Sequence, residues 1–396
     1  MMKTQITVFW PVKKAPDIEE VSFSYDFCKK ISRNNCLNGI PACQWKDYIP
    51  GSCTADMTEQ AEGEYLLVVT DPETVLTAEA VTHMTDVMEK GNYPIAVPVF
   101  NETPFTVQQA ELFFRYINMS TYLEIVKSMS ERTDKGIIPI SRPDPACILY
   151  RRDSFVRFGD MLSFSSSSEP IETGAVVDKD ALVHRFGNYY HGERPDLAQL
   201  VPESVKNLLD VGCAMGGYGR KLRQMRPDIV LTGVEMNPLM AEAARKYYDR
   251  IIDCPIEKAD LTCDFDLINC GDVIEHIMNP WDMLKHFYKL LRPNGFLVLS
   301  IPNAGHWSIV RDLLKGEFPY IPVGLTCITH IRWFTESSIR QALENSGFSI
   351  EILQKAQIPP TPEGSRFIRD MCEKGYGNED SLLTNEITIR AVKKCA

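Results

Sequence analysis

A run of glycines directly after an apolar segment is the part of the sequence best suited to binding a ligand. Val205–Val211 is short, apolar and rich in residues that favour strands, and it is followed by Gly212, Gly216, Gly217 and Gly219. Glycine lets the backbone come within contact distance of a ligand, and the start of the helix expected next adds unpaired N–H groups and a partial positive charge. The stretch therefore predicts a strand, a ligand-binding turn and a helix.

Two carboxylates flank this turn. Asp210 stands just before the first glycine, and Glu235 ends the next expected strand, Ile229–Val234. A carboxylate beside the turn suits a cationic amino-acid group, and an acidic residue at the end of the second strand can accept hydrogen bonds from both hydroxyls of a ribose. The glycines do not follow the G-x-G-x-x-G spacing of dinucleotide sites. Together these residues predict a nucleoside that carries a cationic amino-acid group.

Three of the seven histidines follow expected strands, where ligands bind in open α/β sheets. His276 comes after the strand Phe265–Asn269, His306 comes after Phe296–Ile301, and His330 lies further along the same connection. Imidazole titrates near neutral pH, so a histidine can remove a proton from a hydroxyl group. We expect His276 or His330 to be the general base, with His306 as the third candidate.

The elements that must position these residues alternate between strand and helix from residue 201 to residue 396. This alternation predicts an α/β fold, a Rossmann-like sheet of seven strands with helices on both faces. Two insertions, residues 302–335 and 356–384, follow the carboxyl ends of strands and contain glycine, proline and aromatic residues. We expect them to form the walls of the substrate site.

The pair Asp210 and Glu235, the glycines between them, and the string FDLINCGDVIEHIMNPWDMLKHFYKLLRPNGFLVLSIPN resemble class I S-adenosylmethionine-dependent methyltransferases. The resemblance covers residues 187–396. It implies that S-adenosyl-L-methionine is the cofactor and that its methyl group is transferred by an in-line displacement. Most of the catalysis in such a reaction comes from alignment of the acceptor, the methyl group and the sulfur.

The resemblance also implies which residues contact the cofactor. Tyr190 is expected to cover the methionine part, and Arg194 to pair with its carboxylate. The alternative is a surface loop in which Pro195 opens a helix. In relatives, an aspartate at the position of Pro255 often binds the adenine amino group. The proline side chain cannot, so the Ile256 N–H or a neighbouring carboxylate is expected to serve. The expected cofactor contacts are Tyr190, Arg194, Asp210, Gly212, Ala214, Gly216, Glu235, Met236, Ile256, Asp272 and Val273.

The segments SIPNAGHWS and THIRWFT resemble methyltransferases found among polysaccharide and natural-product genes. They imply a hydroxyl group of a small molecule as the acceptor, either a sugar or glycan precursor or a natural product, with nitrogen and carbon acceptors left open. Arg332 and Trp333 are expected to shape the acceptor pocket.

Asp272, Glu275 and His276 form an acidic-histidine cluster similar to the E…EH pattern with which some quinone-biosynthesis methyltransferases bind a divalent ion. A hard cation would suit the carboxylates. Glu275 and His276 are adjacent and can face apart, however, and an acidic residue here can instead cap the following helix. We therefore assign no metal ion to this cluster and leave metal dependence through Asp272, Glu275 and His276 open.

Residues 1–160 are predicted to form a second, N-terminal α/β domain, and residues 161–200 a linker and a cofactor-covering segment. The strings VVTDPETVLTAEAVTHM and YPIAVPVFNET resemble the nucleotide-sugar half of family 2 glycosyltransferases, where an acidic cluster holds a metal and a sugar diphosphate. Here that cluster is Asp71-Pro72-Glu73, and no second acidic motif or base follows. We expect a degenerate domain that serves docking or dimerisation; a simple turn at the end of the strand is the alternative.

The formal net charge of −11 argues against nucleic-acid binding, which needs a basic face. No apolar stretch reaches the length of about 18 residues that a membrane-spanning helix needs. The 12 cysteines contain no C-x-x-C pair, which favours reduced thiols over a zinc site. We expect a cytoplasmic protein with a small-molecule acceptor, no nucleic-acid or membrane partner, and homodimerisation left open.

Other functions stay open at this point. A nicotinamide-dependent oxidoreductase would use the same turn, although the spacing of the glycines speaks against it. Pro255 suggests a non-catalytic scaffold that binds an S-adenosyl ligand or has lost the site. A bifunctional glycosyltransferase–methyltransferase is the third alternative.

Overall fold

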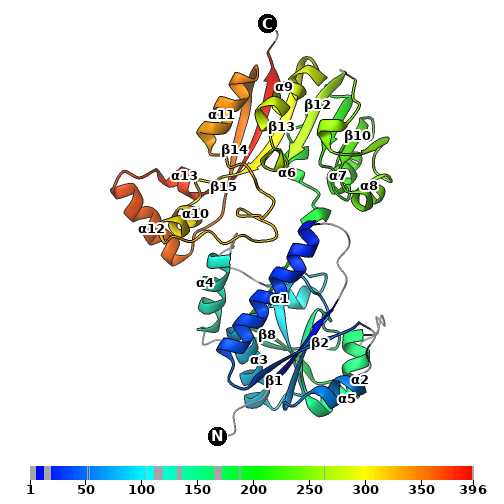
Figure 1. Cartoon of the computed structure of the whole chain (residues 1–396), viewed down its shortest axis with the longest axis vertical. Helices are drawn as coiled ribbons and strands as arrows, with labels where there is room; N and C mark the ends of the chain where they lie inside the picture. The colour runs from blue at the N-terminus through cyan, green and yellow to red at the C-terminus, as the bar shows by residue number, and fades with distance from the viewer. Residues whose placement is uncertain are drawn as a thin grey trace. The chain divides into compact units, whose positions relative to one another are not determined.

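The chain divides into two units, Met1–Gly187 and Asn188–Ala396, and each contains a sheet (Figure 1). The structure, a computed structural model, describes residues 6–12, 19–50, 52, 54–101, 103–110, 119–131, 136–164, 172–186, 189–262 and 264–394. Within these ranges no helix combines the length and the apolar character needed to cross a membrane.

The first unit is built on an eight-stranded mixed sheet in the order β2-β1-β3-β7-β5-β8-β4, with β6 paired to β8. Its strands are β1 (Ile6–Pro11), β2 (Cys43–Tyr48), β3 (Tyr65–Val69), β4 (Thr74–Val75), β5 (Ile95–Phe100), β6 (Ile137–Pro139), β7 (Cys147–Arg151) and β8 (Ala175–Arg185). Its helices are α1 (Glu19–Gly39), α2 (Thr54–Gln60), α3 (Ala78–Gly91), α4 (Met119–Ser130) and α5 (Arg152–Gly159). β1, β3 and β5 are buried along their whole length, as apolar strands covered on both faces must be.

β8 lies in the segment that the sequence predicts to be a linker. It pairs with β5, β6 and β4, so the first unit extends to residue 187 and not to residue 160. The strand is hard to recognise because Asp178, Lys179 and Asp180 interrupt its apolar pattern, and the register with β5 shifts at the same place, between Val97 and Val99. Residues 165–171 of the expected linker lie outside the described residues.

The second unit confirms the predicted seven-stranded sheet, with strands in the order β11-β10-β9-β12-β13-β15-β14. These strands are β9 (Asn207–Val211), β10 (Val230–Glu235), β11 (Arg250–Asp253), β12 (Phe265–Gly271), β13 (Leu291–Pro302), β14 (Phe348–Gln357) and β15 (Thr384–Lys393). β15 runs antiparallel to β13 and β14, whereas the pairs from β11 to β13 are parallel. The carboxyl ends of β9, β10, β12 and β13 therefore meet at one edge.

Helices cover both faces of this sheet (Figure 1). Neighbouring strand residues point to opposite faces, so Leu208 packs in one apolar cluster and Leu209 in the other. The first cluster includes residues of α6 (Pro195–Ala198), α7 (Gly217–Met225) and α8 (Pro238–Ala244). The second includes residues of α9 (Pro280–Leu290) and α11 (Glu336–Asn345).

The same local pattern starts the helices that follow β10 and β12. Asn237 caps α8 by accepting from the N–H groups of Leu239 and Met240, and Asn279 caps α9 by accepting from Asp282 N. A proline occupies the first helical turn in each case, where its missing N–H is not needed. These caps hold the ends of β10 and β12, where Glu235 and His276 lie, against the start of a helix.

The two expected insertions pack on each other. Residues 303–335 contain α10 (Trp307–Leu314), and residues 358–383 contain α12 (Pro362–Glu373) and α13 (Glu379–Leu383). Trp307, Ile368 and Leu382 form a small apolar cluster between them. The insertions thus build one added layer beyond the ends of β13, β14 and β15.

Candidate active site

The backbone between β9 and α7 makes the predicted turn. Gly212, Ala214 and Gly216 have left-handed φ angles of +71°, +45° and +83°. Glycine adopts this conformation without strain, whereas Ala214 does so at some cost. A Cβ atom added to Gly217 would lie only 2.2 Å from the carbonyl oxygen of Gly192. Only glycine fits there, because the segment before α6 crosses the start of α7.

Glu235, the last residue of β10, closes the turn from the other side. One carboxylate oxygen accepts from Ala214 N and the other from Asn237 N, both at 2.9 Å. The side chain is buried. The carboxylate is therefore held beside the glycine turn, where the sequence places it.

Asp210 is buried in β9 and makes its contacts within the protein. One oxygen accepts from Tyr248 Oη and the other from Asn269 Nδ2 at 2.7 Å. Burial raises the pKa of Asp210 to about 6, the charge of Glu235 adds to the shift, and the two hydrogen bonds oppose it. The side chain ties β9 to β12 and to the residues after α8.

Arg194 lies at the centre of a charged cluster at the ends of β12 and β15. Its guanidinium contacts Asp196 at 2.7 Å, and also Asp272 and Glu386. Ser300 Oγ donates to Asp272 at 2.7 Å. Arg194 and Asp272 both have positive φ angles, +44° and +52°, which non-glycine residues keep only where the surroundings hold them. Burial and then the charge of Asp272 raise the pKa of Glu386 to about 7.

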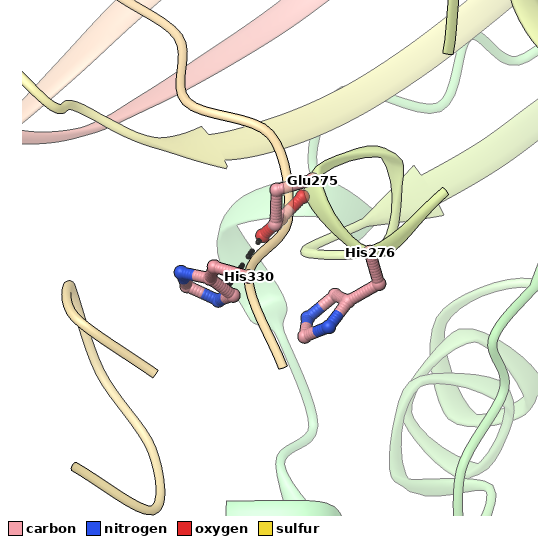
Figure 2. Close-up of side chains that lie close together, drawn as sticks. All are labelled: Glu275, His276 and His330. Carbon is pink, nitrogen blue, oxygen red and sulfur yellow. Dashed lines mark ion pairs between the residues drawn. The ribbon is translucent and has the colours of Figure 1, made fainter. Parts of the chain in front are cut away.

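His276 and His330 lie side by side, with ring centroids 4.8 Å apart and planes inclined by 76° (Figure 2). His276 ends a short 3₁₀ helix after β12, and His330 belongs to the first insertion. Nδ1 of His276 lies 3.1 Å from Thr329 O, and Nδ1 of His330 lies 3.2 Å from Leu325 O. A carbonyl oxygen only accepts, so we assign the hydrogen to Nδ1 and the lone pair to Nε2 in both rings.

Glu275 adjoins this histidine pair and is almost fully buried, with 1% of its surface exposed. Figure 2 shows its carboxyl group directed at His330, with Oε1 3.9 Å from Nε2. Among the described residues neither carboxyl oxygen has a hydrogen-bond partner. Burial, aided by the charge of Asp272, raises the pKa of Glu275 well above its ordinary value.

The backbone of Glu275 fastens the first insertion to the end of β12. Its carbonyl oxygen accepts from Ile331 N at 3.1 Å and from Arg332 N at 3.0 Å. Burial, and then the charge of His276, lower the pKa of His330 to about 4. The insertion is thus anchored next to the histidine pair.

Aromatic side chains of the first insertion stand beside His330. Ring centroids are 5.2 Å apart for Phe318 and Trp333, 5.2 Å for Phe318 and Tyr320, and 5.7 Å for His330 and Trp333. Trp333 is 36% exposed and Tyr320 46% exposed. They form an aromatic wall with one accessible side.

Sequence similarity to a known family covers the part of the chain that contains the glycine turn and Glu235. Residues 183–352 match the family described as "Methyltransferase domain". The second unit is a class I S-adenosylmethionine-dependent methyltransferase domain. Its cofactor is S-adenosylmethionine, so the nicotinamide alternative is not retained.

Curated relatives share parts of this methyltransferase domain. A mitochondrial ubiquinone biosynthesis O-methyltransferase of Schizosaccharomyces pombe is 30% identical over 31% of this chain, which spans 47% of that protein. A malonyl-[acyl-carrier protein] O-methyltransferase of Geobacter sulfurreducens is 23% identical over 50% of the chain and 76% of the relative. A ubiquinone biosynthesis O-methyltransferase of Coxiella burnetii is 24% identical over 39% and 68%. The chain therefore spans about half the length of the first relative.

Similar solved structures cover about half of the chain. One is a possible histamine N-methyltransferase of Thermotoga maritima, with a TM-score of 0.38 and 20% identity over 52% of this chain and 89% of that one. Another is the plantazolicin methyltransferase BpumL in complex with SAH, with a TM-score of 0.36 and 15% identity over 50% and 80%.

The structure gathers most of the expected cofactor contacts of the methyltransferase domain around the turn. The carbonyl oxygen of Tyr190 accepts from Met215 N at 3.4 Å, so the Tyr190 segment lies over the turn. Val273 packs against Gly212, since a Cβ atom added there would meet its Cγ2 at 2.4 Å. Met236, beside Glu235, is 70% exposed, and Ile256 starts a short 3₁₀ helix. Their contacts with the cofactor stay predictions.

Two of the residues expected to contact the cofactor have partners within the protein. Asp210 is expected to meet a cationic group of the ligand, but both of its oxygens accept from side chains of the protein. Arg194 is expected to pair with the methionine carboxylate, but three carboxylates already surround its guanidinium. The partners of both residues come from distant strands and helices, which local spacing does not reveal.

His306 is also placed differently from its expected catalytic role. Its Nδ1 accepts from Ser308 N at 3.2 Å and so caps α10. The side chain is buried, and burial together with the charge of Arg311 lowers the pKa of His306 to about 3. A buried helix cap of this kind is a poor proton acceptor near neutral pH.

Glu275, His276 and His330 are the residues here that could hold a metal ion, because one ligand atom from each lies within 4.8 Å of the others. This set differs from the cluster suggested by the sequence, because Asp272 is engaged by Arg194 and Ser300. Sequence reasoning also missed Glu386. That residue meets Arg194 across a separation of 192 residues, and no local motif marks it.

Proposed function

We propose that the chain transfers the methyl group of S-adenosylmethionine to a hydroxyl oxygen of a small molecule, with His276 as the general base. The acceptor in this proposal is a sugar or glycan precursor or a natural product. The observation that carries the proposal is the pairing of His276 and His330 at the carboxyl end of β12, each with its Nδ1 against a backbone carbonyl.

The difference in burial supports His276 as the base in this proposal. His330 is buried, its pKa is lowered to about 4, and its Nε2 faces the carboxyl group of Glu275. His276 is only partly buried, and its Nδ1 contact leaves Nε2 as the basic nitrogen. A base works best when its pKa lies near the operating pH, and a pKa of about 4 makes His330 a poor base there.

In the proposed step, His276 Nε2 takes the proton of the acceptor hydroxyl as its oxygen attacks the methyl carbon. The carbon–oxygen bond forms while the carbon–sulfur bond breaks, and the electron pair of that bond stays on the sulfur. The sulfonium becomes a neutral thioether, and the imidazolium of His276 later releases its proton to water. His330 stays neutral meanwhile, because a second cation beside the first would be disfavoured.

The names of the relatives support oxygen as the acceptor atom. The relatives in Schizosaccharomyces pombe, Coxiella burnetii and Geobacter sulfurreducens are all O-methyltransferases. The sugar or natural-product preference rests on the segments around His306 and His330 and on the aromatic wall beside the base.

The test is the pair of variants His276→Gln and His286→Gln, assayed by release of S-adenosylhomocysteine with a panel of hydroxylated sugars and phenols. We expect His276→Gln to lower kcat about 100-fold or more, the usual contribution of a positioned base. His286 lies on α9 outside the site and serves as the control. Calorimetric affinity for S-adenosylhomocysteine should stay within about twofold in both variants, since neither residue is expected to touch the cofactor. An unchanged kcat in His276→Gln would overturn the assignment of the base.

A further inference from the structure

Arg332 lies close in the fold to the histidine pair, and among the described residues it has no acidic partner. Its guanidinium donates to the carbonyl oxygens of Ile331, at 3.0 Å, and of Met278, and it approaches Met278 Sδ at 3.7 Å. The Nε–H group is buried and has no hydrogen-bond partner in the described part of the chain. Several donors of this side chain are thus matched only by neutral groups or by none.

Several other arginines of the second unit are paired with carboxylates. Arg194 pairs with Asp272, Arg292 with Asp264, and Arg340 with Glu336. In a chain whose net charge is −11, acidic side chains are abundant, yet none lies within ion-pair distance of Arg332 among the described residues. A guanidinium left in this state is suited to an anionic group of a ligand.

Arg332 is held in place by the segment that carries the proposed base. The backbone N–H of Arg332 donates to Glu275 O at 3.0 Å, and its side-chain Nη2 donates to Met278 O. Glu275 and Met278 lie on either side of His276 in the sequence. Two contacts therefore fix Arg332 against the short stretch that contains the proposed base.

Aromatic rings accompany this cation. The guanidinium carbon lies 5.9 Å from the ring centroid of Trp281, which is 48% exposed. Next to Arg332 in the chain, Trp333 forms part of the aromatic wall with Tyr320, and both rings are partly exposed. Such rings bind the flat face of another ring, while the cation binds a charged substituent.

We propose that the acceptor is an anion: a ring compound that bears a phosphate or a carboxylate, which Arg332 binds while the adjacent aromatic rings contact the ring. This inference rests on the proposed function, because it names the substrate class of the same site. A guanidinium matches two oxygens of either anion, so phosphate and carboxylate share the recognition chemistry. Binding of the anion fixes the distance from the ring hydroxyl to His276.

The experiment uses the full-length protein with S-adenosylhomocysteine bound and two sets of matched probes. One set is glucose, glucuronate and glucose 6-phosphate; the other is phenol, 4-hydroxybenzoate and 4-hydroxyphenyl phosphate. Calorimetry gives the Kd of each probe, and methylation assays with S-adenosylmethionine give KM and kcat. The comparison within each set separates carboxylate from phosphate as the preferred anion.

We expect at least one anionic probe to bind about tenfold or more tightly than its neutral counterpart, as a charge-assisted pair of hydrogen bonds provides. Arg332→Gln should abolish this preference by raising Kd and KM while leaving kcat less affected. Arg332→Lys should keep part of the preference, and Arg340→Gln, the control on α11, should keep all of it.

Equal binding of neutral and anionic probes, no binding of any anionic probe at millimolar concentration, or an unchanged preference in Arg332→Gln would each overturn the inference. Failure of S-adenosylhomocysteine to bind would instead overturn the proposed function. The probes are then titrated without it, so that the role of Arg332 is decided separately.

Discussion

The surroundings of each histidine ring decide what that histidine can do. His306 and His330 are buried, and burial lowers the pKa of the first to about 3 and of the second to about 4. His276 is only partly buried and has a carbonyl oxygen at Nδ1. The sequence places three histidines after strands, but only the packing shows that their roles differ. His306 caps a helix, His330 is a buried neighbour, and His276 is the proposed base.

His306 should make the stability of the protein depend on pH. Its pKa is about 3 in the folded state and about 6.5 when unfolded, so between these values the unfolded chain alone binds the proton. Stability contributed by this residue is therefore present above about pH 6.5 and is lost as the pH falls, by at most about 1.4 kcal/mol per unit.

The variant His306→Asn keeps a capping side chain but cannot titrate. Urea unfolding at pH 7 and pH 5 should show a smaller loss of stability in this variant than in the wild type. The same loss in both proteins would show that His306 does not resist protonation in the folded state.

Removal of divalent ions should leave methyl transfer unchanged. A hard cation needs several oxygen ligands, whereas Glu275 is the only carboxylate beside His276 and His330 in the cluster described here. We expect the same kcat before and after dialysis against EDTA, with S-adenosylhomocysteine release as the readout. Activity lost on dialysis and restored by one divalent ion would contradict the expectation and assign the three residues to a metal.

Residue roles were predictable where they depend on local spacing. Glu235 lies beside the glycine turn as expected, because strand ends and turns follow from short-range pattern. The partners of Asp210 and Arg194, Tyr248 and Glu386 among them, could not be predicted because they come from other elements. The sequence alone does not distinguish a carboxylate that is buried against other side chains from one that binds a ligand.

At the scale of elements, regular alternation of strand and helix made the seven-stranded sheet predictable. β8 was not predictable, because Asp178 and Asp180 are charged residues typical of loops. In the structure both side chains are buried within the strand. The contact of α10 with α12 was also beyond the sequence, since Trp307 and Ile368 come from different insertions. Amphipathic patterns show that a face is buried but not which partner buries it.

The crossing of the Tyr190 segment over α7 gives a prediction at this scale. Gly217→Ala would place Cβ 2.2 Å from Gly192 O and 2.5 Å from His191 O, both backbone atoms that cannot rotate away. The segment must shift off the turn, so we expect affinity for S-adenosylhomocysteine to fall about tenfold or more, measured by calorimetry.

Gly316→Ala is the matched control. Gly316 has a φ of +77° with nothing within 4 Å of an added Cβ, so this variant carries conformational strain without a clash. It should lose some stability and keep its affinity for the cofactor product. Equal affinity in Gly217→Ala would show that the segment does not depend on close contact with α7.

At the scale of the whole molecule, the two units differ in whether the residues expected to bind a ligand are already engaged by other side chains. In the first unit, Arg185 pairs with Asp71 at 2.7 Å and with Asp144 at 3.0 Å. The carboxylate that would hold a metal and a sugar diphosphate is thus already neutralised by a side chain of the protein. In the second unit the glycine turn keeps its close backbone approach and its carboxylate, Glu235.

Calorimetric unfolding of the full chain with and without ligands should reflect this difference. S-adenosylhomocysteine at about 100 times its Kd should stabilise the second unit by about 2.7 kcal/mol, which raises its transition by about 5–10 °C. UDP-glucose with Mn²⁺ should move neither transition, because Asp71 is held by Arg185. Asp71→Ala, which removes the proposed acidic ligand, should behave like the wild type toward UDP-glucose.

The two ligands together decide among the remaining functions of the whole chain. No shift with S-adenosylhomocysteine would favour a scaffold whose cofactor site has decayed, with Pro255 as the residue that signals the loss. A shift of the first transition by UDP-glucose, absent in Asp71→Ala, would show that Arg185 yields the carboxylate to a ligand and that the chain has two transferase sites. A shift by S-adenosylhomocysteine alone agrees with one working transferase site, in the second unit.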